Sequence, residues 1–179
     1  LVWVAVSQLS ARRTPATSSP SVAAVIPIVS ATDFDPVADK GSGNENARLA
    51  PRAIDNDPDS AWLSERYRGD ARLGRLKPGV GLVLDLGSTK TVSQVSVSVI
   101  GKGTAVELRI PADATVTAAP MRSQADWATI AAVGKASGTA VMKPDKPVKT
   151  RFLLVYLTSL PPESGNYFQG GITNIEVRG

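Results

Sequence analysis

A short segment in the middle of the chain alternates strictly between apolar and small polar residues. Residues 95–99 read Val-Ser-Val-Ser-Val. A period of two places all of the valines on one face of an extended strand, whereas a helix would scatter them around its axis. The same alternation occurs at 106–110 and 173–178, and no window of a dozen residues has a helical period. The pattern predicts an all-β chain.

Further apolar runs of strand length lie at 25–29, 81–86, 127–133 and 152–157. The last of these is apolar on both faces, which predicts a central strand. Pro27 has no N–H to donate to a sheet, so the first run is expected to be an edge strand or a strand end.

Glycine-rich signals separate several of these runs. Gly101-Lys102-Gly103, Gly134 and Ser137-Gly138 are each expected to form turns between strands. Several short strands separated by turns predict a β-sandwich or a barrel.

The composition excludes several classes of function. The chain has no cysteine and no histidine. It therefore has no disulfide, thiolate zinc site or thiol nucleophile, and it lacks the commonest general base. Only a hydrolase with paired carboxylates stays formally open. The net charge of +4 is too small to indicate nucleic-acid binding. The sequence predicts a protein that is not an enzyme and has no nucleic-acid partner.

The sequence divides into three parts. Residues 1–6 are all apolar and are expected to be the end of a transmembrane helix; a loose terminus or a short extra strand is the alternative. Residues 7–21 are rich in Ser, Thr, Ala, Pro and Arg, which predicts a flexible linker. Residues 22–179 carry the strand pattern and are expected to form the folded domain. The expected location is the extracytoplasmic face of the cell membrane, although Arg12 and Arg13 favour the opposite side.

Four segments in the same order resemble the discoidin-like family, the coagulation factor 5/8 C-terminal type. The segment at 53–62, Ala-Ile-Asp-Asn-Asp-Pro-Asp-Ser-Ala-Trp, is similar to the family's turn before the core strands. Residues 84–87, 92–99 and 172–179 are similar to three of its strands. The resemblance implies a jelly-roll β-sandwich of the galactose-binding-like type. It also implies that Trp62 lies in the core beneath the turn.

A narrower resemblance is carried by the segments at 34–36, 43–46 and 77–81 together with Tyr67. They are similar to the external C-terminal domain of actinobacterial MurJ/MviN-type proteins, which are lipid II flippases. This resemblance implies a membrane-tethered module in peptidoglycan precursor export. Its expected partner is a cell-wall glycan, a peptidoglycan precursor or another membrane protein.

The alternating aspartates of the turn at 55–59 allow two interpretations. The resemblance implies a structural calcium ion, a hard cation that takes several oxygen ligands. Carried over to this sequence, the ligands are Arg52, Asp55, Asp57, Ser60, Thr173 and Asn174. Asn174 stands where the family has an acidic ligand, so one carboxylate is missing. The alternative is a turn in which the aspartate side chains accept backbone N–H bonds.

Two loops are candidates for ligand binding. The loop at 65–77 holds five basic and two acidic residues, and the loop at 166–169 holds two aromatic residues. Loops gathered at one end of a sandwich commonly bind ligands, with rings facing sugars and Arg or Asn bonding hydroxyl or phosphate groups. The candidate residues are Arg66, Tyr67, Arg68, Asn166, Tyr167 and Phe168. The alternatives are solvated loops without a ligand, in a structural or protein-interaction domain.

Overall fold

The computed structural model describes Val2 and residues 21–179, which form an all-β protein. The expected membrane stub and linker, apart from Val2 and Ser21, lie outside the described residues. Within the described part of the chain, no helix is long and apolar enough to span a bilayer. The helical segments that it contains are short 3-10 turns: η1 (Val37–Asp39), η2 (Ala47–Ala53), η3 (Leu73–Arg75) and η4 (Gln124–Asp126).

The strands differ greatly in length, from two residues to eighteen. In chain order they are β1 (Val25–Ile26), β2 (Ser30–Phe34), β3 (Trp62–Leu63), β4 (Tyr67–Arg68), β5 (Val80–Val92), β6 (Gln94–Pro111), β7 (Trp127–Met142), β8 (Val148–Ser159), β9 (Tyr167–Phe168) and β10 (Gly171–Arg178).

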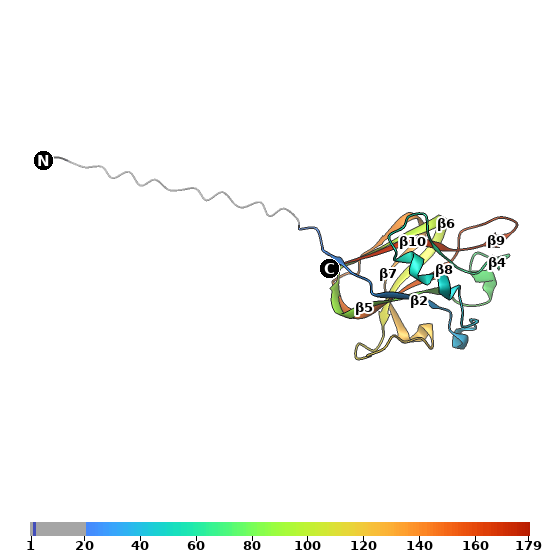
Figure 1. Ribbon diagram of the computed structural model, residues 1–179, viewed down its shortest axis with the longest axis horizontal. Coiled ribbons are helices and arrows are strands. Elements are labelled where there is room, and N and C mark those ends of the chain that lie inside the picture. The colour runs from blue at the N-terminus through green and yellow to red at the C-terminus, as the bar shows by residue number, and fades with distance from the viewer. Residues whose placement is uncertain (1, 3–20) are drawn as a thin grey trace.

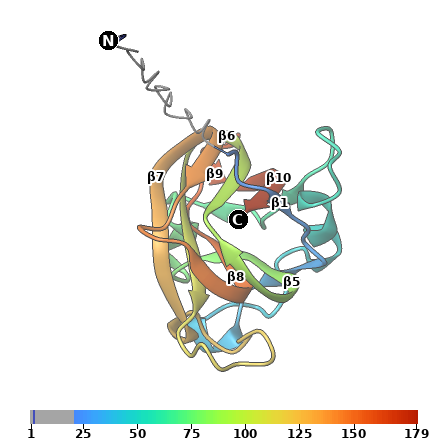
Figure 2. The same cartoon turned by 90° about the vertical axis from the view of Figure 1, so that its left-hand side faces the viewer.

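One antiparallel sheet in the order β1-β10-β6-β8-β5-β2 curls around the core, with β3 added to β10 and β7 added to β6 (Figure 2). The expected all-β sandwich is thus confirmed. As predicted, β8 is a central strand between β5 and β6, and β1 is an edge strand that ends just before Pro27. A separate two-stranded ribbon is formed by β4 and β9.

Strand β6 belongs to both layers of the curled sheet. Its first half, from Gln94 to Val99, pairs with β10, and its second half, from Ala105 to Arg109, pairs with β8. Between the halves, Gly101 and Gly103 have φ angles of 78° and 101°, which L-residues rarely adopt. The expected turn at 101–103 is therefore wrong: the glycines bend one continuous strand, and the turns expected at 134 and 137–138 lie inside β7.

The main core lies between the layers. Val95, Val97 and Val99 are buried there while the serines between them are only half-buried, as their period of two predicts. Trp62 is fully buried in the same core, which confirms its expected place.

A second, smaller core lies on the outer side of the sheet. Trp127 contacts Phe34 edge-to-face at 6.2 Å, and its Nε1 donates to the Pro120 carbonyl at 2.8 Å. Trp127 is therefore a packing residue, and it anchors the loop that follows β6.

The two ends of the sandwich have different contents. At one end, Ala24 and Gly179 exchange backbone hydrogen bonds at 3.0–3.1 Å, so the entry to the domain lies beside its C-terminus (Figure 1). The β4–β9 ribbon lies at the opposite end. Any ligand at the ribbon would therefore bind far from the point where the preceding chain enters the domain.

Candidate functional site

The two loops that the sequence singles out come together as the β4–β9 ribbon. Tyr67 lies opposite Phe168, and Arg68 lies opposite Tyr167. Next to these pairs, the Gly69 N–H donates to the Asn166 carbonyl at 2.9 Å. The structure thus brings the candidate ligand residues together from segments that are about a hundred positions apart in the sequence.

The outer face of the ribbon carries Arg66, Arg68 and Tyr167, because cross-strand partners and alternate residues share a face. The Arg66 guanidinium lies 4.5 Å from the centre of the Tyr167 ring, and its Nε donates to Glu163 at 2.8 Å. Arg68 and Asn166 are exposed beside them. We call Arg66, Arg68, Glu163 and Tyr167 the ribbon face. It combines an aromatic ring with donors and an acceptor for hydrogen bonds.

The inner face of the ribbon belongs to the core. Phe168 packs against the main core, and Tyr67 is only 5% exposed. The expectation that Tyr67 is an exposed ring for a ligand is wrong. Its hydroxyl donates to both oxygens of the buried Glu45 carboxylate, at 2.7 and 2.8 Å. Burial, together with the neighbouring Glu45 carboxylate, raises the pKa of the Tyr67 hydroxyl far above its usual range.

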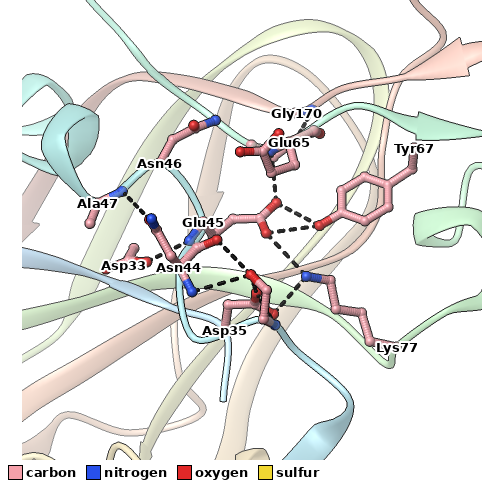
Figure 3. A network of polar contacts seen from close by, with 12 residues as sticks. Asp33, Asp35, Asn44, Glu45, Asn46, Ala47, Glu65, Tyr67, Lys77 and Gly170 are labelled. Atoms are coloured by element: carbon pink, nitrogen blue, oxygen red, sulfur yellow. Dashed lines mark hydrogen bonds and ion pairs between the residues drawn. The ribbon is translucent and has the colours of Figure 1, made fainter. Parts of the chain in front are cut away.

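Lys77 is one of the five basic residues of the loop at 65–77, and it is buried. Its side chain is 8% exposed. Its Nζ contacts Asp35 Oδ1 at 2.6 Å and Glu45 Oε2 at 3.1 Å, and both of these carboxylates are fully buried (Figure 3). We call Asp35, Glu45, Tyr67 and Lys77 the buried charge network. The residue pattern does not predict that these four side chains meet, although all four belong to the segments that carry the narrower resemblance.

Glu45 is the centre of this network. Its Oε1 accepts the Glu65 N–H at 2.8 Å and its carbonyl accepts Trp62 Nε1 at 2.9 Å. Burial raises the pKa of the Glu45 carboxyl, and the hydrogen bond from Tyr67 and the charge of Lys77 partly offset this rise. Through Glu65 and Tyr67, this one side chain fixes the residues on either side of Arg66. The network therefore holds the ribbon face in place.

The aspartate turn after η2 has the hydrogen bonds of the alternative interpretation. Asp55 Oδ1 accepts the Asp57 N–H at 3.0 Å, and Asp57 Oδ1 accepts the Asp59 N–H at 3.0 Å. Ser60 Oγ donates to Asp55 Oδ2 at 2.6 Å and lies 3.3 Å from the Arg52 carbonyl. These bonds, from Ser60 and then from Asp57, lower the pKa of the Asp55 carboxyl. Four of the expected metal ligands thus lie close together at the end of η2 and in the turn after it: Arg52, Asp55, Asp57 and Ser60.

The other two expected ligands lie on β10. Thr173 Oγ1 is 3.4 Å from the Ser98 carbonyl, and Asn174 Oδ1 is buried with no hydrogen-bond partner in the described chain. An unpaired buried oxygen is what a cation ligand looks like in the absence of its ion. However, residues 21–179 contain no group of three acidic, histidine or cysteine side chains suited to a metal. The residues fit a calcium ion only with several carbonyl and amide ligands, and the calcium site stays a prediction.

Comparison with known proteins identifies the fold. No family model matches the chain. Chitosan-binding module 1 of a chitosanase/glucanase from Paenibacillus sp. IK-5 has a TM-score of 0.57 and 16% identity over 88% of this chain and all of that module. The chain shares the jelly-roll β-sandwich fold of that module.

Other solved modules agree. The family 32 module of AlyQ, in complex with 4,5-unsaturated mannuronic acid, has a TM-score of 0.57 and 16% identity over 86% of this chain and 97% of the other. The family 32 module of C. perfringens NanJ, in complex with galactose, has a TM-score of 0.53 and 15% identity, covering 87% and 98%. At these identities the likeness establishes the discoidin-like sandwich itself. The ligand has to be argued from this chain's own residues.

Proposed function

We propose that this chain is a non-catalytic module that binds a glycan on the ribbon face. The observation that carries the proposal is the arrangement of Arg66, Arg68 and Tyr167 on one outward surface of a sandwich shared with carbohydrate-binding modules. Aromatic rings pack against the apolar face of a pyranose, while guanidinium groups donate to its hydroxyl and ring oxygens. Glu163 supplies an acceptor for sugar hydroxyls on the same surface.

Preorganisation supports this assignment. Arg66 is held between the Tyr167 ring and Glu163, and the residues before and after it are bonded to Glu45. Side chains that are already ordered lose less conformational entropy when a ligand binds. Because exposed arginines are ordinarily mobile, an ordered one beside an aromatic ring is an economical way to build a shallow sugar site.

We also propose a biological setting, which rests on the sequence resemblance to MurJ/MviN-type domains. In this setting the chain lies outside the cytoplasmic membrane and is tethered to it by an upstream helix. The ligand is then a cell-wall glycan or a lipid-linked peptidoglycan precursor. The ribbon lies at the opposite end from the entry of the chain, so a tether at the entry would leave the ribbon face accessible.

Calorimetric titration with galactose, chitotriose and muropeptides tests the proposal. Tyr167→Ala is expected to weaken binding of the best ligand about five- to tenfold, since stacking on one aromatic residue contributes about 1–1.5 kcal/mol. Arg68→Gln tests the hydrogen-bonding part of the face, and Arg122→Gln, an exposed arginine in the loop between β6 and η4, is its matched control. Absence of binding by all of these ligands at about 10 mM would refute glycan binding and favour the protein-interaction alternative.

A further inference from the structure

A second surface of the domain has the features of a binding site. A concave groove of about 600 Å³ is lined by Asn44, Asn46, Ala47, Arg48, Leu49 and Arg52. These residues come from η2 and from the loop that leads into it, and none of them belongs to the ribbon face. A volume of about 600 Å³ is large enough for a group the size of a sugar unit. The cavity beside Arg75 and Pro78 is smaller, at about 270 Å³.

The walls of the groove are fixed by hydrogen bonds and packing. Asn44 Oδ1 accepts the Ala47 N–H at 3.1 Å (Figure 3), and Asn46 Nδ2 donates to the Leu63 carbonyl at 2.9 Å. Ala50 and Ala53 anchor the inner side of η2 in the main core. Asn46 is held in the left-handed region at a φ of 57°, an uncommon conformation outside glycine that often marks a functional position. The groove is thus a preformed feature of the fold.

The charge of the groove is not balanced by ion pairs. Arg48 and Arg52 lie four residues apart on η2 and are both exposed. Within residues 21–179 neither guanidinium forms a salt bridge. Each guanidinium has several N–H groups, two of which can donate to the two oxygens of one oxyanion.

Three acidic residues, Asp55, Asp57 and Asp59, lie in the turn that follows η2, while Glu45, between Asn44 and Asn46, is buried in the charge network. The Arg52 charge acts on Asp55, but it is the smallest of the influences that lower the pKa of that carboxyl. The Asp55 oxygens are taken by Ser60 Oγ and the Asp57 N–H, and one Asp57 oxygen is taken by the Asp59 N–H. The Asp55 carboxylate is therefore bonded within the turn, and within residues 21–179 none of the three aspartates forms a salt bridge with Arg48 or Arg52.

We propose that the Arg48–Arg52 groove binds an oxyanion, a carboxylate or a phosphate, carried on an acidic saccharide. The inference rests on the proposed glycan binding for the saccharide part and on the two guanidinium groups for the anion. Arg48 and Arg52 pair with the oxyanion, Asn44 and Asn46 present amide groups to neighbouring hydroxyls, and Leu49 forms an apolar floor. A glycan that also contacts the ribbon face would then be held by two separate surfaces of one domain.

The test uses the 179-residue chain and calorimetric titration with tri-galacturonic acid, with the neutral galactose trisaccharide of the same length, and with inorganic phosphate. Arg48→Gln and Arg52→Gln are each expected to weaken binding of the acidic trisaccharide about tenfold, the effect of losing one charge-assisted hydrogen bond. Neither change should alter binding of the neutral trisaccharide. Arg122→Gln removes an equal charge elsewhere and is expected to change the affinity for the acidic trisaccharide less than about twofold.

The outcomes separate this inference from the proposed function. Equal affinity for acidic and neutral trisaccharides, unchanged in Arg48→Gln and Arg52→Gln, would overturn the groove while leaving glycan binding intact. Loss of acidic binding in Arg68→Gln alone would also overturn it, because the oxyanion would then lie on the ribbon face. Phosphate binding that both groove variants weaken, without binding of either trisaccharide, would support the oxyanion site and refute the proposed glycan function.

Discussion

Removal of the lysine from the buried charge network is the sharpest perturbation that the structure offers. In Lys77→Met the ammonium group disappears while most of the buried side-chain volume is kept. Asp35 and Glu45 then remain fully buried without their shared cation, 2.6 and 3.1 Å from where the Nζ had been. Breaking one side of a buried ion pair costs about 3–5 kcal/mol. For a domain of this size, that is a fall of roughly 6–20 °C in the melting temperature.

The effect should depend on pH with a defined sign. The pKa of Glu45 is already raised, so the charged carboxylate destabilises the fold as pH rises through that pKa. Without Lys77 the pKa rises further, and the penalty in the variant grows between acidic and neutral pH. The difference in unfolding free energy between wild type and Lys77→Met should therefore be largest near about pH 7 and shrink toward about pH 4.

Urea denaturation followed by circular dichroism at several pH values measures this difference. Lys146→Met, which removes an exposed lysine from the turn before β8, is the control and should change stability by less than about 0.5 kcal/mol. A loss below about 1 kcal/mol for Lys77→Met at neutral pH would refute the reasoning. So would a loss that is the same at every pH, because it would have no link to the protonation of Glu45.

Three further predictions concern other parts of the fold. Trp62→Phe should lower the free energy of unfolding in urea denaturation by about 1–3 kcal/mol, because it removes the Nε1 bond to the buried Glu45 carbonyl. An unchanged free energy of unfolding would contradict that role. Gly103→Ala should cost about 1 kcal/mol from its φ of 101° alone, since no atom lies within 4 Å of an added Cβ; equal or greater stability would contradict the bent-strand account of β6. If the aspartate turn holds calcium, millimolar calcium raises the melting temperature of the wild type and not of Asp55→Asn. An unchanged melting temperature in both would leave the turn as a hydrogen-bonded structure only.

The sequence predicts the fold well where apolar residues recur at a regular spacing, or continuously, along a strand. The valines at 95–99 specify a buried face on their own, and the apolar run at 152–157 specifies a central strand. Glycine was harder to interpret, because a left-handed residue serves equally to reverse a chain or to bend a strand. Gly101 and Gly103 bend β6 between two layers, and this depends on strands β8 and β10, which are distant in the sequence.

The candidate site was also predicted only in part. Sequence reasoning found both halves of the ribbon, because basic and aromatic residues cluster in two loops. It did not find which residues face inward. Tyr67 was predicted to be a ligand residue, and Lys77 was interpreted only as one of five basic loop residues. Both lie in the interior, bonded to Glu45 and Asp35, which are 22 and 42 positions away from them in the sequence. Burial of a charge depends on a partner across such distances, and a single sequence carries no record of that pairing. Their only trace was that all four residues fall within the segments quoted for the narrower resemblance.

Nuclear magnetic resonance mapping of a bound oligosaccharide tests the central claim most directly. The account predicts that shift changes concentrate at residues 66–68 and 166–168, with intermolecular contacts between sugar protons and the Tyr167 ring. Saturating ligand that shifts other surfaces and leaves these two segments unchanged would contradict the assignment of the ribbon face.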